Sequence, residues 1–205
     1  MSKMLRFLSS SGSALVALSF AGCTMDDPRY GADTQYLGGG YGNQPVGPSA
    51  PTDSISYWDG DGVSGSSSIK IALSEQRAYF YKSGQLVGIS QLSSGQEGRD
   101  TPAGKFKISQ KDKDHVSNLY GDYVDSAGNV VKSNVGIKED AKPPGTRFKG
   151  APMPYFMRIT SGGVGMHAGY LPGYPASHGC IRMPEYMAEA FFNAVSVGTP
   201  VTITR

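Results

Sequence analysis

The chain has 205 residues and a formal net charge of +2, with 28 glycines, 13 prolines and only 18% charged residues. Such a composition excludes a coiled coil or a Lys/Glu-rich helical bundle and favours strands and loops. The small net charge gives no indication of nucleic-acid binding. No apolar run in the sequence reaches the roughly 18 residues that a membrane-spanning helix needs.

Residues 1–22 have the pattern of an export signal. Lys3 and Arg6 supply positive charge, and residues 14–21 (ALVALSFA) form a short apolar stretch that ends just before Cys23. This order of charged, apolar and small residues is typical of secretory signal peptides. Three interpretations of this segment are considered: an ordinary signal peptide, a lipoprotein signal and a buried amphipathic helix.

The end of this segment favours the lipoprotein signal. The sequence Ala21-Gly22-Cys23 resembles the end of a bacterial lipoprotein signal. This resemblance implies that Cys23 carries lipid and becomes the new N-terminus. The next residue is Thr24 and not Asp, which in the sorting of such lipoproteins implies the outer membrane. We therefore expect a periplasmic protein that its lipid holds to the outer membrane.

Residues 23–65 have the composition of a flexible linker. Between residues 31 and 65 there are nine glycines, three prolines and four aspartates but no lysine or arginine. So few apolar side chains cannot bury enough surface to offset the entropy lost on ordering. We therefore expect a tether, in which only aromatic residues such as Tyr57 and Trp58 can dock on the domain that follows.

Residues 66–205 alternate polar and apolar side chains in short segments, as half-buried strands do. The segments Arg77–Lys82 and Gln85–Leu92 flank the turn signal Ser83-Gly84 and are expected to pair as a hairpin. A second hairpin is expected within Asp122–Asn134. Further strands are expected at Ser68–Leu73, Lys105–Ser109, Met153–Thr160, Val164–His167 and Val201–Thr204.

Only residues 184–197 have helical spacing. Pro184 and Glu185 suit the first turn of a helix, and Gly198 suits its C-terminal cap. Many short strands with one late helix predict a mainly β fold, a β-sandwich or barrel with the helix packed on it. The expected apolar face of the helix consists of Met187, Ala188, Phe191, Phe192 and Val195.

Cys180 has no cysteine partner within the chain if Cys23 carries lipid. An unpaired cysteine in an exported protein is joined to another chain, buried and inert, or reactive. Cys180 lies in the polar run SHGCIR, residues 177–182. Because His, Arg and backbone amides stabilise a thiolate, this setting favours a reactive thiol.

A zinc site is the competing interpretation of the same residues. His167, His178 and Cys180 are three possible ligands. The sequence has no CxxC and no HExxH motif, so we expect no metal site. His115, among two lysines and two aspartates, is expected to be a solvated loop residue. Whether the segment Gln110–Gly121 forms a lid over a cleft is left open.

The run SHGCIRMP, residues 177–184, resembles the active-site signature of L,D-transpeptidases with a YkuD (ErfK/YbiS/YcfS/YnhG) catalytic domain. His167 ends an expected strand, as the first motif histidine of that family does, and TPAGKF at residues 101–106 resembles its TPxGxF turn. The resemblance covers residues 66–205 and implies the mainly β fold of the family. Two departures are the nine residues between His167 and Ser177, fewer than the family usually has, and Ala168 in place of Gly or Ser.

The resemblance implies a role for each motif residue. Cys180 is the expected nucleophile and His167 the base, with the backbone carbonyl of Ala168 orienting the imidazole. The amides of Gly179 and Cys180, with help from His178, are expected to bind the oxyanion. The alternative for His178 is a structural side chain that faces the core.

Two further motif residues have expected roles around these groups. Arg182 either holds a carboxylate of the substrate peptide or braces the loop. Ser177 is expected to be a local hydrogen-bond partner and not a nucleophile. If His167 and Cys180 form an ion pair, alkylation of Cys180 should persist well below the ordinary thiol pKa of about 8.5.

The reaction implied by the resemblance is transfer between peptide stems of peptidoglycan. Cys180 would form a thioester with the third stem residue, a diaminopimelate in Gram-negative walls, and release D-Ala. An amine of another stem, or of an outer-membrane protein, would then resolve it to give a 3-3 cross-link or an anchored protein. The alternatives are an L,D-carboxypeptidase or hydrolase of the same stem, a catalytically silent peptidoglycan-binding lipoprotein, and a structural lipoprotein that tethers wall to membrane.

Overall fold

The computed structural model describes residues 53–205. The predicted signal peptide, the predicted lipidation site Cys23 and most of the predicted linker lie outside the described residues. Within residues 53–205 the chain forms thirteen strands in three sheets and one α-helix. The prediction of a mainly β fold with a single late helix is therefore confirmed.

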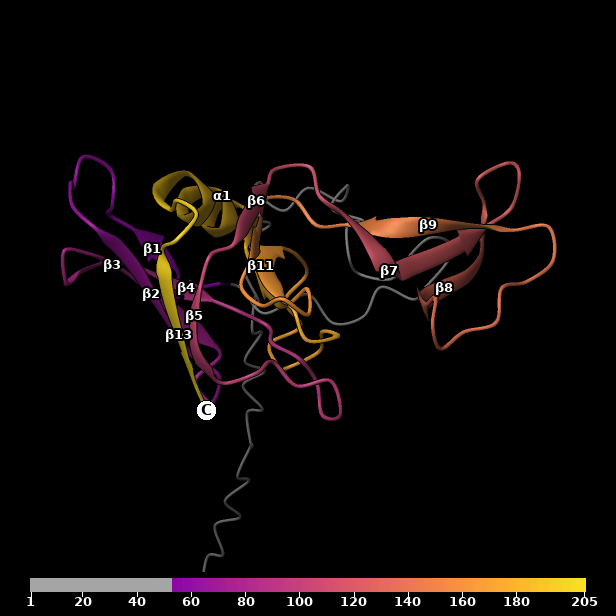
Figure 1. Ribbon diagram of the computed structural model, residues 1–205, viewed down its shortest axis with the longest axis horizontal. Helices are drawn as coiled ribbons and strands as arrows, with labels where there is room; N and C mark the ends of the chain where they lie inside the picture. Colours follow the sequence, from indigo (N-terminus) through magenta and orange to yellow (C-terminus); the bar gives the residue numbers. More distant parts are fainter. Residues whose placement is uncertain (1–52) are drawn as a thin grey trace, which may run out of the picture. The chain divides into compact units, whose positions relative to one another are not determined.

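The largest sheet has six strands in the order β1-β4-β3-β2-β13-β5 (Figure 1). The predicted hairpin is present as β3 and β4, and Ser83 and Gly84 at its turn have φ of 47° and 83°, as a tight hairpin turn requires. The C-terminal strand β13 lies between β2 and β5, so its predicted place in a sheet is confirmed. The strands are β1 (Tyr57–Trp58), β2 (Ser67–Ala72), β3 (Arg77–Lys82), β4 (Gln85–Gln91), β5 (Gly104–Lys107) and β13 (Pro200–Thr204).

The ordered domain begins before residue 66, where composition places the end of the linker. Strand β1 pairs with β4, so residues 53–65 belong to the domain. The ring of Trp58 packs edge-on against Phe80 at a centroid distance of 5.0 Å and lies 5.8 Å from the ring of Phe191. Composition misses this segment because one aromatic side chain supplies most of its apolar contact.

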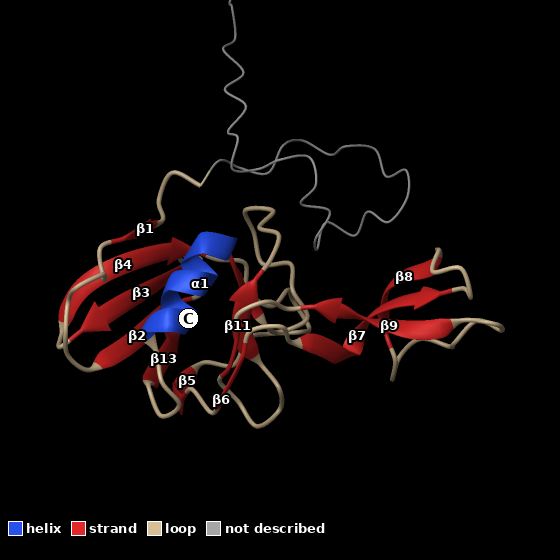
Figure 2. Ribbon diagram, turned by 90° about the horizontal axis from the view of Figure 1, so that it is seen from above, coloured by secondary structure: helices blue, strands red, loops and turns tan. Residues whose placement is uncertain are grey.

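The helix α1 (Glu185–Ala194) is shorter than the predicted 184–197. It ends because the β-branched Val195 adopts extended backbone angles, with φ −99° and ψ 157°. The predicted cap, Gly198, instead donates its N–H to the carbonyl of Ile108 at 2.8 Å, in the turn that leads to β13. The helix lies between the six-stranded sheet and β11 (Figure 2), and it buries Met187, Ala188 and Phe191.

A second sheet has four strands in the order β12-β11-β10-β6. Strands β11 and β12 run parallel, whereas β10 is antiparallel to both β11 and β6. The sequence analysis misses β6 and β12 because three residues are too few to show alternation. It also predicts longer or earlier segments for the other two strands. The four strands are β6 (Gln110–Asp112), β10 (Phe156–Arg158), β11 (Gly165–Ala168) and β12 (Ile181–Met183).

A third sheet is inserted between β6 and β10 and has the order β8-β7-β9. Its hairpin of β7 and β8 turns at residues 125–129, where the sequence predicts a turn. The segment Gln110–Gly121, which the sequence leaves unassigned, is largely strand. This sheet lies on the far side of β11 from the six-stranded sheet in both views (Figures 1 and 2). Its strands are β7 (Val116–Val124), β8 (Val130–Gly136) and β9 (Arg147–Pro152).

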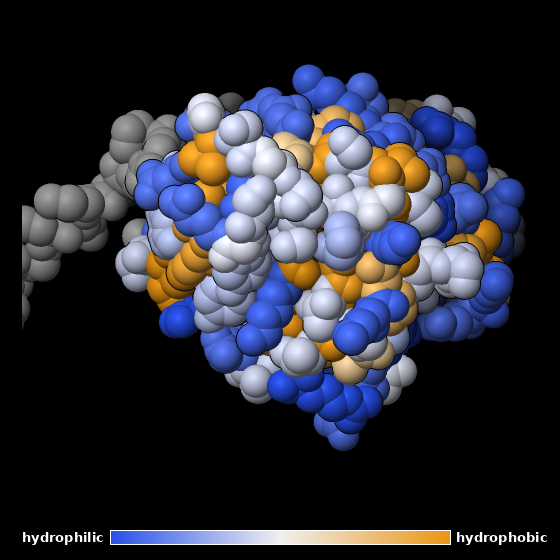
Figure 3. Space-filling model, turned by 60° about the vertical axis from the view of Figure 1, so that its left-hand side comes forward, coloured by the Kyte–Doolittle hydropathy of each residue, from blue (hydrophilic) through white to orange (hydrophobic). Residues whose placement is uncertain are grey.

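The main core lies between the six-stranded sheet, the four-stranded sheet and α1. Fully buried side chains from all three meet there, and methionine is frequent among them, which suits an irregular space between different elements. On the face shown in Figure 3, exposed apolar residues appear in separate small groups among polar ones. The core includes Ile71, Phe80, Leu92, Met157, Met166, Met183, Met187 and Phe191.

Candidate active site

The register of the four-stranded sheet assigns its side chains to two faces. Met166 on β11 lies opposite Met157 on β10 and Ile181 on β12, and these three side chains are in the main core. Because successive side chains of a strand point to opposite faces, the neighbouring positions face away from that core. His167, opposite Arg182, is one of these positions.

His167 is almost completely buried, with 4% of its surface exposed. Its Nδ1 lies 2.8 Å from the carbonyl oxygen of Ala168. Since a carbonyl only accepts hydrogen bonds, Nδ1 carries the proton and Nε2 holds a free lone pair. Burial lowers the pKa of His167 to about 4, against the smaller opposing effect of the Ala168 carbonyl. The imidazole is therefore neutral near pH 7, and the orienting carbonyl lies where the resemblance implies.

Cys180 directly precedes β12, at the level of Gly165 on β11. Its Sγ lies 3.9 Å from the carbonyl oxygen of Gly163. Burial raises the pKa of the thiol, while a hydrogen bond from the backbone of Gly165 and the charges of Arg182 and Arg158 act in the opposite direction. Cys180 is a free thiol that the surrounding protein keeps in its neutral form.

The pKa shifts of Cys180 and His167 have opposite signs but the same consequence. Raising the pKa of a thiol and lowering that of an imidazole both favour the uncharged group. Burial thus disfavours an ion pair between these two groups, and each is neutral in the free protein near pH 7.

The residues before Cys180 form a tight turn that hydrogen bonds hold in place. Ser177 Oγ donates to the carbonyl of Cys180 and accepts the N–H of Gly179 at 3.1 Å. Gly179 has φ of +111°, a backbone conformation that favours glycine. The predicted local role of Ser177 agrees with these bonds. The Gly179 amide, however, which the resemblance assigns to the oxyanion, is already bonded to Ser177.

Thr101, the first residue of the TPAGKF run, holds this turn through its side-chain hydroxyl. Its buried hydroxyl donates to the carbonyl of Gly179 at 2.8 Å and accepts the N–H of Gly95 at 2.9 Å. The sequence analysis singles out the motif but gives Thr101 no role. Only the TPAGKF motif itself could have suggested such a role, because Thr101 lies far from Cys180 in the chain.

His178 stacks on Tyr120 of β7, with ring centroids 4.4 Å apart and an interplanar angle of 27°. An ion pair between Arg99 and Glu139, with a nitrogen–oxygen distance of 2.6 Å, joins the loop before β5 to the turn after β8. The guanidinium of Arg99 also lies 6.0 Å from the centre of the Tyr120 ring. The inserted sheet therefore contacts the turn of residues 177–180 directly. The sequence analysis misses Tyr120, since no motif marks it.

Arg182 is half-buried on the same sheet face as His167, and burial lowers the pKa of its guanidinium. Its backbone pairs with Ser93, with both hydrogen bonds 3.0 Å long. This pairing ties β12 to the loop that precedes β5. The backbone of Arg182 thus braces the loop, whichever role its side chain has.

The short connection between His167 and Ser177 forms a loop anchored at several points. The carbonyl of Tyr174 accepts the hydroxyl of Ser93 at 2.7 Å, and the N–H of Ala176 bonds to the carbonyl of Ser94 at 3.0 Å. Nine residues are therefore enough to connect the parallel strands β11 and β12 without a helix. The shorter spacing leaves the two motif segments side by side.

His115 lies at the neck of the inserted sheet, and the prediction that it is solvated is wrong. Its ring stacks on Phe156 at a centroid distance of 4.2 Å, and Nδ1 lies 3.0 Å from the carboxylate of Asp112. The prediction fails because the neighbouring charges suggest a loop, whereas Phe156 comes from a distant strand. A positive charge on His115 lowers the pKa of His167, so the two rings interact electrostatically.

Two further observations concern metal binding and membrane spanning in the described part of the chain. Among residues 53–205, no three His, Cys, Asp or Glu side chains form a group that could hold a metal ion. The only helix described, α1, is neither long nor apolar enough to cross a membrane.

Comparisons with known proteins agree on one family. The sequence profile of the YkuD family, the L,D-transpeptidase catalytic domain, matches residues 66–203. The chain is 31% identical over 121 residues to a Mycobacterium tuberculosis protein named "Probable L,D-transpeptidase 3", an alignment that covers 57% of this chain and 38% of that protein. The chain thus spans well under half the length of this curated relative.

Solved structures show a similar fold. An L,D-transpeptidase from Mycobacterium smegmatis matches with a TM-score of 0.53 and 19% identity, covering 68% of this chain and 59% of that one. L,D-transpeptidase 3 from Mycobacterium tuberculosis matches with a TM-score of 0.53 and 21% identity, covering 68% of this chain and 61% of that one. At such identities the likeness is one of fold. Together with the family profile, it shows that the chain belongs to the YkuD family of L,D-transpeptidase catalytic domains.

Proposed function

We propose that the protein is a peptidoglycan L,D-transpeptidase that uses Cys180 as its nucleophile and His167 as its general base. The observation that supports this proposal is that His167 lies on β11 with its Nδ1 fixed by the Ala168 carbonyl, while Cys180 directly precedes the neighbouring parallel strand β12. That bond leaves Nε2 as the basic nitrogen. The family to which the chain belongs supports a peptide stem of peptidoglycan as the substrate.

In the first half-reaction, Cys180 attacks the carbonyl of the third stem residue of a donor tetrapeptide. His167 Nε2 takes the thiol proton as the carbon–sulfur bond forms, because burial keeps both groups neutral until the substrate arrives. The resulting imidazolium then protonates the amine of the terminal D-Ala. The bond to D-Ala breaks, and a thioester remains on Cys180.

The developing oxyanion needs hydrogen-bond donors that are not already occupied. Because Ser177 Oγ accepts the amide of Gly179, we assign the main donor to the amide of Cys180, with His178 as the second group. Arg182 is the candidate to hold a stem carboxylate near His167, opposite which it lies.

In the second half-reaction an amine resolves the thioester. His167 accepts a proton from the attacking amine and returns it to the departing thiol, so that the enzyme is restored. The side-chain amine of a second stem gives a 3-3 cross-link, and the amine of an outer-membrane protein gives an anchored protein. No step requires a metal or an organic cofactor.

We also propose that the chain is a lipoprotein of the periplasm, with Cys23 as the lipidated residue and the outer membrane as its site. The export pattern of residues 1–22 and the linker composition that follows support this location. A Cys23→Ala variant should move from the detergent-soluble membrane fraction to the soluble fraction. Persistence of the variant in the membrane fraction would contradict lipid anchoring.

The proposed activity is tested by incubating the purified full chain with diaminopimelate-containing tetrapeptide muropeptides. We expect cross-linked dimers by liquid chromatography and mass spectrometry, and none with Cys180→Ala. Tripeptide monomers as the sole product would make the enzyme a carboxypeptidase instead. Binding of muropeptides without any product, in wild type and variant alike, would identify a silent binding protein.

A further inference from the structure

Thr101 carries a buried hydroxyl that joins the loop before β5 to the turn of residues 177–180. The residue is 4% exposed. Its Oγ1 accepts the N–H of Gly95 at 2.9 Å and lies 2.8 Å from the carbonyl oxygen of Gly179. Because Gly95 provides the hydrogen of the first bond and a carbonyl only accepts, the single hydroxyl hydrogen of Thr101 must point at Gly179. The direction of this hydroxyl is therefore fixed on both sides.

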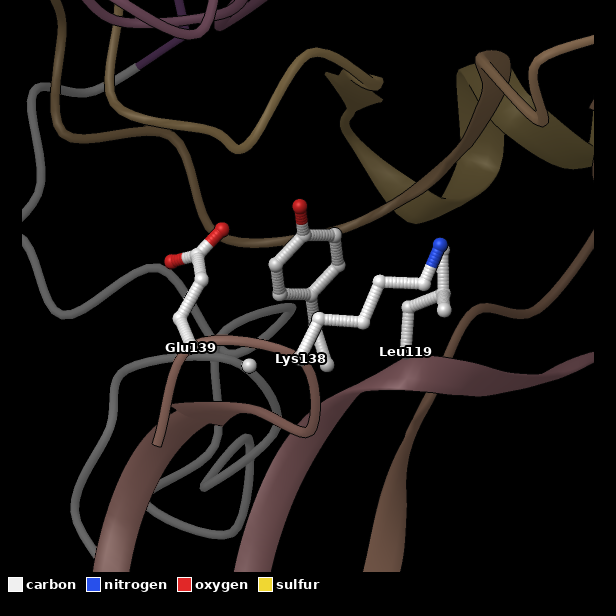
Figure 4. A pocket seen from close by; sticks show the side chains of 5 residues that line it. Leu119, Lys138 and Glu139 are labelled. Atoms are coloured by element: carbon white, nitrogen blue, oxygen red, sulfur yellow. The ribbon is translucent and has the colours of Figure 1, made fainter. Parts of the chain in front are cut away.

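The loop that carries Thr101 is closely folded and held at several points. A Cβ atom added at Gly95 would lie 2.1 Å from the carbonyl oxygen of Arg99. The backbone of Gly95 pairs with that of Ser177. The guanidinium of Arg99 forms its ion pair with Glu139, which extends from the turn after β8 (Figure 4). Thr101 thus donates its hydrogen bond from a backbone that neighbouring elements keep in place.

The bond from Thr101 to Gly179 also sets the direction of the next amide. The carbonyl of Gly179 and the N–H of Cys180 belong to one peptide unit, which is planar and trans. In such a unit the C=O and N–H bonds point in opposite directions. The unit cannot rotate without breaking the hydrogen bond to Thr101, so Thr101 determines where the Cys180 N–H points.

The neighbouring peptide units of the turn are held by Ser177 instead. Its Oγ accepts the N–H of Gly179 at 3.1 Å and donates to the carbonyl of Cys180. The units on either side of the Gly179–Cys180 unit are therefore fixed from within the turn, whereas the unit between them is held by Thr101. The motif serine and the distant threonine thus hold different peptide units of the same turn.

We propose that Thr101 is a positioning residue for the transfer reaction, because its hydroxyl keeps the Cys180 N–H pointed to where the oxyanion develops. This inference rests on the proposed transpeptidase function. When Sγ adds to the donor carbonyl carbon and His167 takes the thiol proton, the π electrons of the carbonyl move to its oxygen, which accepts the Cys180 N–H. A donor that is already oriented stabilises this charge without reorganising. Thr101 itself touches no substrate atom and acts only through this amide.

The test compares two reactions of the same thiol in the full-length protein. Release of D-Ala from a diaminopimelate-containing tetrapeptide passes through an oxyanion, whereas alkylation by iodoacetamide displaces iodide from a saturated carbon and forms none. Thr101→Val keeps the shape of the side chain and removes its hydroxyl. We expect kcat for D-Ala release to fall roughly ten- to hundredfold, as misplacement of a catalytic group does, with KM and the rate of alkylation unchanged.

Thr101→Ser restores the hydroxyl and should restore most of kcat. Thr146→Val is the matched control, since Thr146 is also buried and its hydroxyl donates to the carbonyl of Pro143 at 2.7 Å, just before β9. This control should change neither rate. If Thr101→Val does not fold, Thr101→Ala, which leaves space for water at the lost hydroxyl, is measured in the same two reactions and should show the same split.

An alkylation rate that changes along with D-Ala release in Thr101→Val would show a general disturbance of the turn and overturn the proposal. A serine variant no faster than the valine variant would overturn it as well. If the wild type releases D-Ala and Thr101→Val releases it equally fast, only the role of Thr101 fails. If the wild type is alkylated at Cys180 but releases no D-Ala, the proposed transpeptidase and this inference fail together.

Discussion

His167 lies on strand β11 and Cys180 directly precedes the neighbouring strand β12, and burial keeps both side chains uncharged near neutral pH. Each group alone is unreactive there, since a thiol is a poor nucleophile and an isolated imidazole has nothing to deprotonate. In the proposed reaction, a carbonyl carbon of the substrate is placed beside the sulfur. Proton transfer to Nε2 would then accompany attack, and the Ala168 carbonyl would stabilise the imidazolium that forms.

The first prediction concerns the reactivity of the Cys180 thiol toward iodoacetamide. Because burial raises the pKa of Cys180 above its ordinary value, the rate of alkylation should keep rising through pH 9 without a plateau. His167→Gln should leave this profile nearly unchanged. A plateau already reached at pH 6 to 7, lost in His167→Gln, would show the ion pair instead.

The second prediction concerns stability and follows from the lowered pKa of His167. Between its ordinary value of 6.5 and about 4, the unfolded chain binds a proton that the folded protein does not. The free energy of unfolding should therefore fall as the pH drops through this window. When urea denaturation is measured at several pH values, the free energy of unfolding should depend less on pH in His167→Gln than in the wild type. His115→Gln should keep the pH dependence that His167 contributes. An unchanged slope in His167→Gln would contradict the account.

The elements divide the molecule into a core that holds the site and an inserted sheet that contacts it. Strand β11 carries His167, Cys180 directly precedes β12, and the loop before β5 holds the turn of residues 177–180 through Thr101. The inserted sheet reaches the same turn from another direction, through Tyr120. The position of His178 thus depends on elements far apart in the sequence.

The third prediction tests that contact. Tyr120→Ala removes the stack on His178, which is worth about 0.5–1.5 kcal/mol and corresponds to a rate loss of roughly two- to tenfold. Tyr120→Phe keeps the ring and should keep most of the rate. Steady-state release of D-Ala measures both variants. If the phenylalanine variant were as impaired as the alanine variant, the stack would not be the cause.

The fourth prediction concerns the segment 53–65 and its single tryptophan. Trp58 packs on Phe80 and Phe191 and donates to Asp61 at 2.9 Å. Trp58→Ala should lower the free energy of unfolding by about 3 kcal/mol, the low end for loss of a large aromatic side chain, because Trp58 is partly buried against the core. The neighbouring Tyr57 is more exposed, so Tyr57→Ala should cost much less. Equal midpoints of denaturation for Trp58→Ala and wild type would exclude this segment from the domain.

Over the whole molecule, sequence patterns predict those elements whose structure depends on residues nearby in the chain. The hairpin of β3 and β4 is predictable because both strands alternate and Ser83-Gly84 provides the turn. The helix is predictable from its apolar spacing, although its end depends on the backbone of Val195. Three strands, β6, β9 and β12, are not predictable from the sequence, because they are short or polar and pair only with segments distant in the chain.

The candidate site divides in the same way. Cys180, His167 and their immediate neighbours are predictable, since a motif with a specific chemistry marks them. Thr101 and Tyr120 are not, because their contacts with the site depend on which segments the fold brings together. The packing of Trp58 on the core is not predictable either, since the composition of the sequence around it is that of a linker.

The most direct test of the central claim is the intact mass of the full-length protein after brief exposure to a diaminopimelate-containing tetrapeptide stem. The account predicts a covalent adduct equal in mass to the stem minus its terminal D-Ala, located on Cys180 and absent from Cys180→Ala. An adduct that persists in Cys180→Ala, or no adduct on a folded and reduced wild-type protein, would contradict it.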